Sequence, residues 1–308
     1  MSAVQSRHAA RESLAVRVAV PVGVLFTAVA SLATLLTSAS AASDAPELPA
    51  PAAAMALPTV EVERAAAANP CVDDEVIAAL AAGDDRATVR AFGGGAEFRA
   101  AVVSDNAPCV SLSDPDRTWV VVNKHRPLQP EAFVPASLTG VGVRATSGSD
   151  DLRPEATAAL DAMADAIVAE GAGTIGINNG YRSYDVQTRT YGSHVRQKGQ
   201  AGADAISARP GFSEHQSGLA FDLIACSPQC GSHEAFGSTS QGEWVAANAW
   251  RFGFIVRYEQ GETGTTGYEP EPWHIRYLGE ELAAAYHDGG FHTLEEFFGL
   301  PAAPDYEH

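Results

Sequence analysis

Two histidines and two carboxylates in the last third of the chain have the residue types and spacing of a catalytic metal centre. His215 and Asp222 lie in the segment SEHQSGLAFD, and Glu271 and His274 lie in the segment EPWH. Two imidazoles and one carboxylate can hold a zinc ion and leave a fourth position open for water. The remaining carboxylate is then free to act as a base, so the set predicts metal-assisted hydrolysis.

The elements around these residues must bring them to one point. A straight strand would direct His215 and Asp222 to opposite faces. A turn at Gly218, followed by a short strand over 219–224, can return the carboxylate to the side of the imidazole. Apolar and polar residues alternate over 273–277, so a strand there presents the second histidine on one face. We therefore expect a turn and two strands to assemble the site.

The pattern of the surrounding chain predicts an α+β domain. Apolar residues recur with helical spacing over 154–171. Two further helices are predicted, one that follows Tyr184-Asp185 and runs to about Lys198 and one over 243–251, whereas 174–177 and 254–258 read as strands. These helices and strands do not alternate regularly. We therefore expect a small, largely antiparallel sheet with flanking helices and the metal site on the sheet.

Several motifs in this region carry a family resemblance. Ser-x-His-x-x-Gly-x-Ala-x-Asp ends at Asp222, and Glu-Pro-Trp-His-x-Arg-Tyr ends at Tyr277. The match begins near Trp119 and includes Gly180-Tyr181-Arg182-Ser183. These segments resemble the zinc D,D-carboxypeptidases of the VanY type, in the peptidase group that also contains the D-Ala-D-Ala dipeptidases. The resemblance implies the Hedgehog-like fold of that group.

The resemblance also implies a role for each residue of the motifs. Glu271 would be the general base, and Arg182 would stabilise the transition state, which suits a guanidinium because it is always charged and offers a planar fork of donors. Three residues would bind zinc: His215, Asp222 and His274. Three further residues would help to hold the substrate: Ser183, Gln187 and Ser213.

The activity implied is removal of the terminal D-alanine from peptidoglycan stem peptides that end in D-Ala-D-Ala. An L,D-carboxypeptidase or a peptidoglycan endopeptidase on the same scaffold is an alternative, because the sequence does not show which side of the cleft is closed. A zinc-stabilised cell-wall-binding module without turnover is an alternative from another class. Glu271 and Arg182 argue against that module, since a pure binder needs neither.

The N-terminus predicts export. An uncharged apolar stretch over 18–37 follows three arginines and precedes the small-residue site Ala39-Ser40-Ala41, which is typical of a secretory signal peptide within residues 1–42. The stretch is also long enough to span a membrane, so an uncleaved N-terminal anchor is the alternative. Either form places the catalytic part outside the cytoplasmic membrane, secreted to the cell wall or held at the outer face of that membrane.

Four cysteines agree with an exported chain, in which an even number indicates disulfides. The simplest pairing joins Cys71 to Cys109 and Cys226 to Cys230. A second zinc site made of Cys226, Cys230 and His233 is the competing interpretation, but it lacks a fourth ligand.

The composition divides the rest of the chain. Residues 43–66 are rich in Ala and Pro and predict an extended linker. Residues 67–115 predict a small helical extension that either packs on the catalytic domain or contacts the cell wall or another partner. The catalytic domain is expected over 116–302, and 303–308 is expected to be a tail.

The formal net charge of −18 excludes nucleic acid as an expected partner and favours solubility. The basic cluster Lys124-His125-Arg126 is predicted to be a solvated surface patch, with attraction of a substrate carboxylate as the alternative. The sequence carries no signal of the oligomeric state.

Overall fold

The computed structural model describes residues 69–307. The predicted export segment (1–42) and linker (43–66) lie outside the described residues. Within 69–307, no helix combines the length and the apolar character that a membrane span requires.

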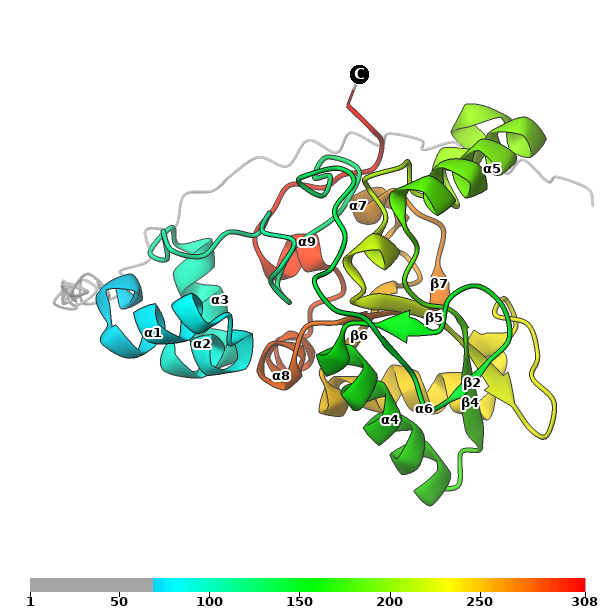
Figure 1. The fold of residues 1–308 in the computed structure, drawn as a ribbon, viewed down its shortest axis with the longest axis horizontal. Helices are drawn as coiled ribbons and strands as arrows, with labels where there is room; N and C mark the ends of the chain where they lie inside the picture. Colours follow the sequence, from blue (N-terminus) through cyan, green and yellow to red (C-terminus); the bar gives the residue numbers. More distant parts are fainter. Residues whose placement is uncertain (1–68, 308) are drawn as a thin grey trace, which may run out of the picture. The chain divides into compact units, whose positions relative to one another are not determined.

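A five-stranded sheet forms the centre of the catalytic part (Figure 1). All neighbouring strands are antiparallel except the short parallel pair at one edge. A separate two-stranded sheet joins β1 (Thr139–Gly140) to β3 (Asp151–Leu152). The small, largely antiparallel sheet confirms the α+β prediction. In spatial order the five strands are β2 (Arg144–Ala145), β4 (Thr174–Asn179), β5 (Ala220–Cys226), β7 (Glu271–Tyr277) and β6 (Phe254–Tyr258).

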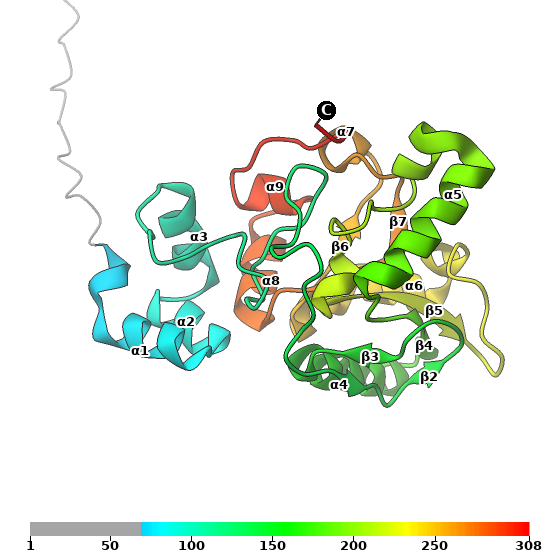
Figure 2. The same ribbon diagram turned by 45° about the horizontal axis from the view of Figure 1, so that its top comes forward.

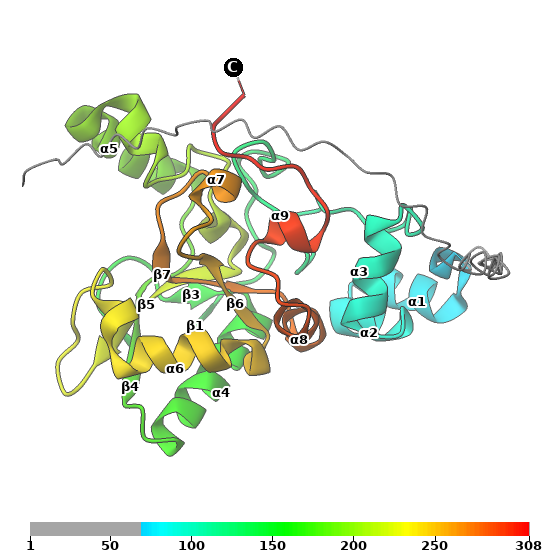
Figure 3. The ribbon, with the colours of Figure 1, turned by 180° about the vertical axis from the view of Figure 1, so that it is seen from behind.

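Two helices cover one face of this sheet, as seen from behind in Figure 3. α4 (Pro154–Ala169) begins with proline in its first turn, as predicted, and α6 (Ser240–Asn248) continues into the 3-10 helix η4 (Ala249–Phe252). Phe221 and Leu223 of β5 are buried in the core beneath these helices. Because successive strand residues alternate between faces, Asp222 points to the opposite side of the sheet.

The opposite side carries the cleft and the longest helix. α5 (Tyr184–Asp204) includes Tyr184 and Asp185, which the sequence placed before the helix, and extends past the predicted end near Lys198. Its regular turns are interrupted at Gly199, where φ is 74°. Three short helical elements lie in the loops that connect the strands: η2 (Glu214–Ser217), η3 (Phe236–Ser238) and α7 (Thr263–Thr266).

The N-terminal extension packs on the catalytic part, beside α8 (Figure 2). Phe98 of the extension shares a core with Trp119 and Leu282. At Gly95, an added Cβ would collide with the backbone carbonyl of Glu281, so this approach requires glycine. These contacts bury apolar side chains of the extension against the catalytic part. The extension consists of η1 (Pro70–Val72), α1 (Asp74–Ala82), α2 (Asp85–Ala91) and α3 (Gly95–Val103). The helices of the catalytic part that share its core are α8 (Glu280–Asp288) and α9 (Leu294–Phe297).

The C-terminal residues differ from the prediction of a tail at 303–308. Ala303 is fully buried, and Tyr306 is 5% exposed. The amide of Ala303 donates to the carbonyl of Thr265 at 2.7 Å. A buried aromatic ring and a backbone hydrogen bond therefore make residues 303–307 part of the folded domain.

Candidate metal centre

The three predicted ligands meet on the open face of the sheet. Asp222 on β5 and His274 on β7 are directly opposite each other in the antiparallel pair, so their side chains lie on the same face. His215 lies in the turn η2, and Gly218 then reverses the chain at a φ of 71°. This turn and the strand that follows bring His215 to the same face, in the way that the spacing predicted.

The distances fit a single divalent ion. His215 Nε2 lies 3.5 Å from Asp222 Oδ2, and His274 Nδ1 lies 3.3 Å from Asp222 Oδ1. One ligand atom from each residue lies within 4.8 Å of the others, and all three residues are buried. Two imidazole nitrogens and one carboxylate oxygen form a donor set that suits zinc, so the residues present fit that metal.

The second nitrogen of each imidazole is held by a hydrogen bond. His215 Nδ1 lies 2.9 Å from the carbonyl oxygen of Gly180, to which it can only donate. His274 Nε2 lies 3.2 Å from Glu214 Oε2. If both nitrogens carry the proton, the lone pairs of His215 Nε2 and His274 Nδ1 face the site, as a metal ligand requires.

Glu214 was not among the site residues predicted from the sequence. Its carboxylate is fully buried and accepts from Arg257 Nε at 3.0 Å and from Arg276 Nη1 at 2.8 Å. Burial alone would raise the pKa of Glu214, but Arg276 and Arg257 hold it well below its usual value. A permanently charged carboxylate therefore lies behind His274. The only signal in the sequence is its position next to His215.

Arg257 extends this network to a second buried carboxylate. Arg257 donates from Nη1 and Nη2 to the carboxylate of Glu295 at 3.0 and 2.8 Å. Glu295 lies on α9 and also accepts from Asn123 Nδ2 at 2.9 Å. The buried charges are thus paired and hydrogen-bonded, which burial of charge demands.

Glu271, the first residue of β7, lies beside the three predicted ligands but farther from His274 than Asp222 does. Its Oε2 lies 3.8 Å from His274 Nδ1. Among residues 69–307 no group donates a hydrogen bond to its carboxylate. Burial raises the pKa of Glu271 to about 7, an effect that His274 opposes. A carboxylate of that pKa beside a metal site is suited to general base catalysis near neutral pH.

Arg182 follows β4 and reaches the same site. Its Nη2 lies 3.9 Å from Asp222 Oδ2, and its Nη1 donates to Gln187 Oε1 at 2.8 Å. The amide oxygen of Asn179, turned toward the guanidinium, accepts from Arg182 Nε at 3.1 Å. Burial lowers the pKa of Arg182 while Asp222 and Glu271 oppose that change, and a guanidinium remains charged throughout.

The three residues that were expected to hold the substrate have different surroundings in the structure. Ser213 lines the cleft. Gln187 is fully buried, and its Nε2 donates to the carbonyl of Ala208, so its contacts are to Arg182 and the backbone. Ser183 caps α5 by accepting from the amide of Val186 at 3.3 Å. Only Ser213 among the three lines the cleft.

The cleft above the ligands has a volume of about 600 Å³. His194 and Lys198 of α5 line one part, and His233 and Trp273 line another. The rings of His233 and Trp273 meet edge to face with centroids 5.0 Å apart. His194 and His233 are thus cleft residues, a position for which His194 had no signal in the sequence.

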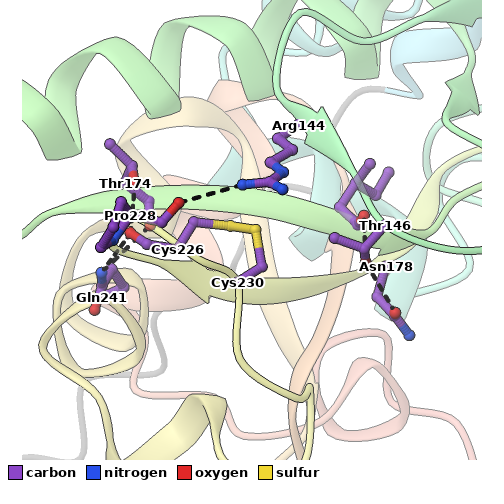
Figure 4. The surroundings of a disulfide bond; sticks show 9 residues. Arg144, Thr146, Thr174, Asn178, Cys226, Pro228, Cys230 and Gln241 are labelled. Carbon is purple, nitrogen blue, oxygen red and sulfur yellow. Dashed lines mark hydrogen bonds between the residues drawn. A yellow bond between two sulfur atoms is a disulfide. The ribbon is translucent and has the colours of Figure 1, made fainter.

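Both disulfides have the pairing that the sequence favoured, Cys71 with Cys109 and Cys226 with Cys230. The second closes a small loop at the end of β5 (Figure 4). Arg144 Nη1 donates to the carbonyl of Pro228 in that loop at 3.2 Å. The Cys226–Cys230 bond leaves no thiolate for a second zinc site with His233, so that interpretation is wrong for the disulfide-bonded protein.

The cluster Lys124-His125-Arg126 is not the surface patch that the sequence predicted, and it does not line the cleft. Lys124 is 3% exposed, and its Nζ donates to the carbonyl of Gly267 at 2.6 Å. Arg126 Nη2 donates to Ser113 Oγ at 2.7 Å. Both interpretations of Lys124 are therefore wrong, because its ammonium is occupied within the protein.

Comparison with known proteins finds similar sequences and folds. A model of the VanY family, described as D-alanyl-D-alanine carboxypeptidase, matches residues 149–280. The protein YodJ of Bacillus subtilis (strain 168) is named as a carboxypeptidase by assignment. It is 39% identical to this chain over 192 residues, which cover 61% of this chain and 69% of YodJ. The D-alanyl-D-alanine carboxypeptidase of Enterococcus faecium is 38% identical over 122 residues, which cover 39% of this chain and 35% of that enzyme.

Among solved structures, the LdcB LD-carboxypeptidase is similar in fold and sequence. Its TM-score is 0.56 at 40% identity, with 60% of this chain and 87% of that chain covered. The structure of LdcB concerns the molecular basis of peptidoglycan recognition. The similarity therefore extends to relatives described by two different carboxypeptidase specificities.

Proposed function

This chain belongs to the VanY family of D-alanyl-D-alanine carboxypeptidases, and we propose that it is an exported zinc enzyme that removes the C-terminal D-alanine from peptidoglycan stem peptides ending in D-Ala-D-Ala. One observation carries the proposal. His215, Asp222 and His274 converge in a cleft where Glu271 and Arg182 also lie. A binding module would need the first three residues but neither of the last two.

The three converging residues would hold zinc. Bound there, the ion would supply a Lewis acid that lowers the pKa of a coordinated water to about 7. The chain supplies the orientation, because Gly180 and Glu214 fix the two imidazoles through their outer nitrogens. Because one nitrogen of each imidazole is hydrogen-bonded to the protein, only the other nitrogen, His215 Nε2 or His274 Nδ1, is available to bind the metal.

Glu271 would move the proton. Its carboxylate accepts a proton from the attacking water while the oxygen of that water bonds to the peptide carbon. The same proton then passes to the nitrogen of the departing D-alanine as the peptide bond breaks. The pKa of about 7 suits both halves of this transfer, since Glu271 can exist in either protonation state near neutral pH.

Arg182 would stabilise the negative charge that develops on the carbonyl oxygen. Gln187 and Asn179 hold its guanidinium from two sides, so little reorganisation is needed at the moment of reaction. Gln187 thereby acts on the reaction through Arg182. Ser213 would contact the peptide, a role that its position in the lining of the cleft supports.

An L,D-carboxypeptidase is the second candidate. The observation in its favour is the similarity to the LdcB LD-carboxypeptidase, at 40% identity and a TM-score of 0.56. Both candidates share the metal centre and differ in the configuration of the residue before the scissile bond. Peptidoglycan as substrate also implies action outside the cytoplasmic membrane, which is the location that the N-terminal sequence predicts.

The test is incubation of the full chain with two stem peptides, a pentapeptide ending in D-Ala-D-Ala and a tetrapeptide ending in a single D-alanine. Products are followed by mass. We expect release of one D-alanine from the pentapeptide, and loss of that release after treatment with a chelator. Release from the tetrapeptide alone would replace the first candidate with the second.

Variants locate the chemistry within the cleft. Glu271→Gln keeps the shape of the side chain but removes the base, and we expect kcat to fall about 10²–10⁴-fold while zinc still binds. Glu243→Gln is the matched control, because it makes the same change from carboxylate to carboxamide at an exposed position on α6. This variant should retain activity. Zinc binding without cleavage of either peptide by the unaltered protein would favour the binding module.

A further inference from the structure

Three contacts fix residues 303–307 to the rest of the domain. The amide of Ala303 donates to the carbonyl of Thr265 at 2.7 Å. Lys124 Nζ donates to the carbonyl of Pro304 at 3.2 Å, and His125 Nε2 lies 2.9 Å from the carbonyl of Asp305. Two residues of the basic cluster therefore bind the backbone of this segment.

Lys124 joins the segment to the loop before β7. Its buried ammonium lies 4.6 Å from the ring centre of Tyr268 and 5.5 Å from that of Tyr306, and it also donates to the carbonyl of Gly267. At Gly267, where φ is 79°, an added Cβ would collide with the carbonyl of Pro304. The loop and the segment are thus in direct contact, and this contact requires glycine.

The hydroxyl of Tyr306 lies where two chain segments meet. It accepts a hydrogen bond from the amide of Arg209 at 2.8 Å and lies 3.1 Å from the hydroxyl of Tyr268. The guanidinium of Arg209 lies 4.1 Å from the ring centre of Tyr306. A bidentate pair then ties Arg209 to Asp204 at the end of α5, at 3.1 and 2.9 Å.

Both segments joined by Tyr306 line the cleft. Residues 206–208 come just before Arg209, and residues 268–271 begin at Tyr268 and end at the proposed base. Behind the second segment, the ring of Tyr268 packs on that of Tyr258 with centroids 4.8 Å apart. Tyr258 in turn packs on His274 at 4.9 Å. Contacts therefore run without a gap from Tyr306 to a proposed zinc ligand.

We propose that residues 303–307 form a buttress of the substrate cleft and that Tyr306 is a positioning residue, whose hydroxyl fixes the lining segments 206–208 and 268–271 relative to each other. Tyr306 does not line the cleft, so it acts through Tyr268 and the backbone of Arg209. The effect on kinetics rests on the proposed function. The effect on the two segments does not.

The first measurement is hydrogen–deuterium exchange on the full chain carrying Tyr306→Phe. This change removes the hydroxyl and keeps the ring. We expect faster amide exchange in 204–212 and 265–271 and no change elsewhere. Tyr286→Phe is the matched control, because Tyr286 is also a buried tyrosine but its hydroxyl has no hydrogen-bond partner among the described residues.

The second measurement is the kinetics of D-alanine release. Loss of hydrogen bonds that position the wall should raise KM about threefold to tenfold in Tyr306→Phe, with a smaller change in kcat. Removal of residues 303–308 should give a larger loss of kcat/KM. Tyr286→Phe should leave both constants unchanged.

The outcomes separate this proposal from the proposed function. Faster exchange in both segments supports the buttress even if the unaltered protein cleaves no stem peptide, a result that would overturn only the proposed function. Unchanged exchange in Tyr306→Phe would overturn the buttress. If the unaltered protein is active, faster exchange with unchanged KM and kcat in Tyr306→Phe would overturn the positioning role of Tyr306. A lower melting temperature of the variant would not by itself support that role.

Discussion

At the scale of single residues, the orientation of His274 depends on a carboxylate that is itself held by two arginines. Glu214 takes one hydrogen bond from each of Arg257 and Arg276 through Oε1, which leaves Oε2 for His274. All four groups are buried, so none can exchange its partner for water. Because the arginines keep Glu214 charged, its acceptor is always available to the imidazole.

Glu214→Gln tests this arrangement. The neutral amide offers one acceptor oxygen for three donors, so His274 loses its fixed orientation in part of the population. We expect zinc affinity to fall about 10–100-fold, as is typical when the hydrogen-bond partner of a ligating histidine is altered. The measurement is competition for zinc with a chromophoric chelator.

Glu295→Gln is the control for that change. It removes a charge from the same buried network, but Glu295 contacts Arg257 and Asn123 and neither imidazole. We expect a loss of stability with zinc affinity nearly unchanged. Equal losses of zinc affinity in the two variants would show that general disruption of the network, and not the contact with His274, is responsible.

At the scale of elements, the loop between β4 and α5 combines Arg182, the proposed catalytic arginine, with the start of a helix. Arg182 extends toward the ligands, while Ser183 turns back and accepts a hydrogen bond from the amide of Val186. An N-cap serine satisfies one of the free amides at the helix start. The rigid start of α5 also fixes Gln187 one turn later, from which Arg182 is held.

Ser183→Ala and Ser213→Ala form a pair that separates capping from substrate contact. Loss of an N-cap should reduce the free energy of unfolding by about 1 kcal/mol, so Ser183→Ala should be less stable but keep its KM. Ser213→Ala removes a hydroxyl that lines the cleft and should raise KM instead. A raised KM in Ser183→Ala, measured with the pentapeptide, would mean that this serine also contacts the substrate.

At the scale of the whole molecule, the buried charges connect parts of the domain that are distant in sequence. Glu295 on α9, Arg257 on β6 and Glu214 beside the cleft form one continuous set of ion pairs. Breaking a buried pair leaves an uncompensated charge, which costs several kcal/mol. Acid should therefore act on the folded state through these carboxylates.

The pH dependence of stability follows from Glu295. Burial alone would raise its pKa, but Arg257 holds it below the usual value of 4.5. The folded state thus binds this proton less readily than the unfolded chain, so the contribution is fully present above pH 4.5 and is lost as the pH falls further, through the lower folded pKa. Urea unfolding at a series of pH values should show stability falling below pH 4.5, and Glu295→Gln should lose part of that dependence. Parallel curves for the two proteins would contradict this origin.

The sequence by itself predicted the cluster of His215, Asp222 and His274, because the information that brings these residues together is local. The seven-residue separation of His215 and Asp222 with Gly218 between them requires a turn and a strand, and that is what the structure has. The alternation around His274 determines its face in the same way. The α+β class also follows from local periodicity and from the irregular order of helices and strands.

The tertiary structure alone decided which residues distant in sequence contact each other. Lys124 contacts the carbonyl of Pro304, and Glu214 contacts Arg276, yet no spacing or periodicity relates the members of either pair. A lysine in a basic cluster and a short C-terminal segment are ordinarily solvated, so the sequence predicts both at the surface. Burial reversed those assignments, because a charge removed from water must find its partners wherever the fold places them.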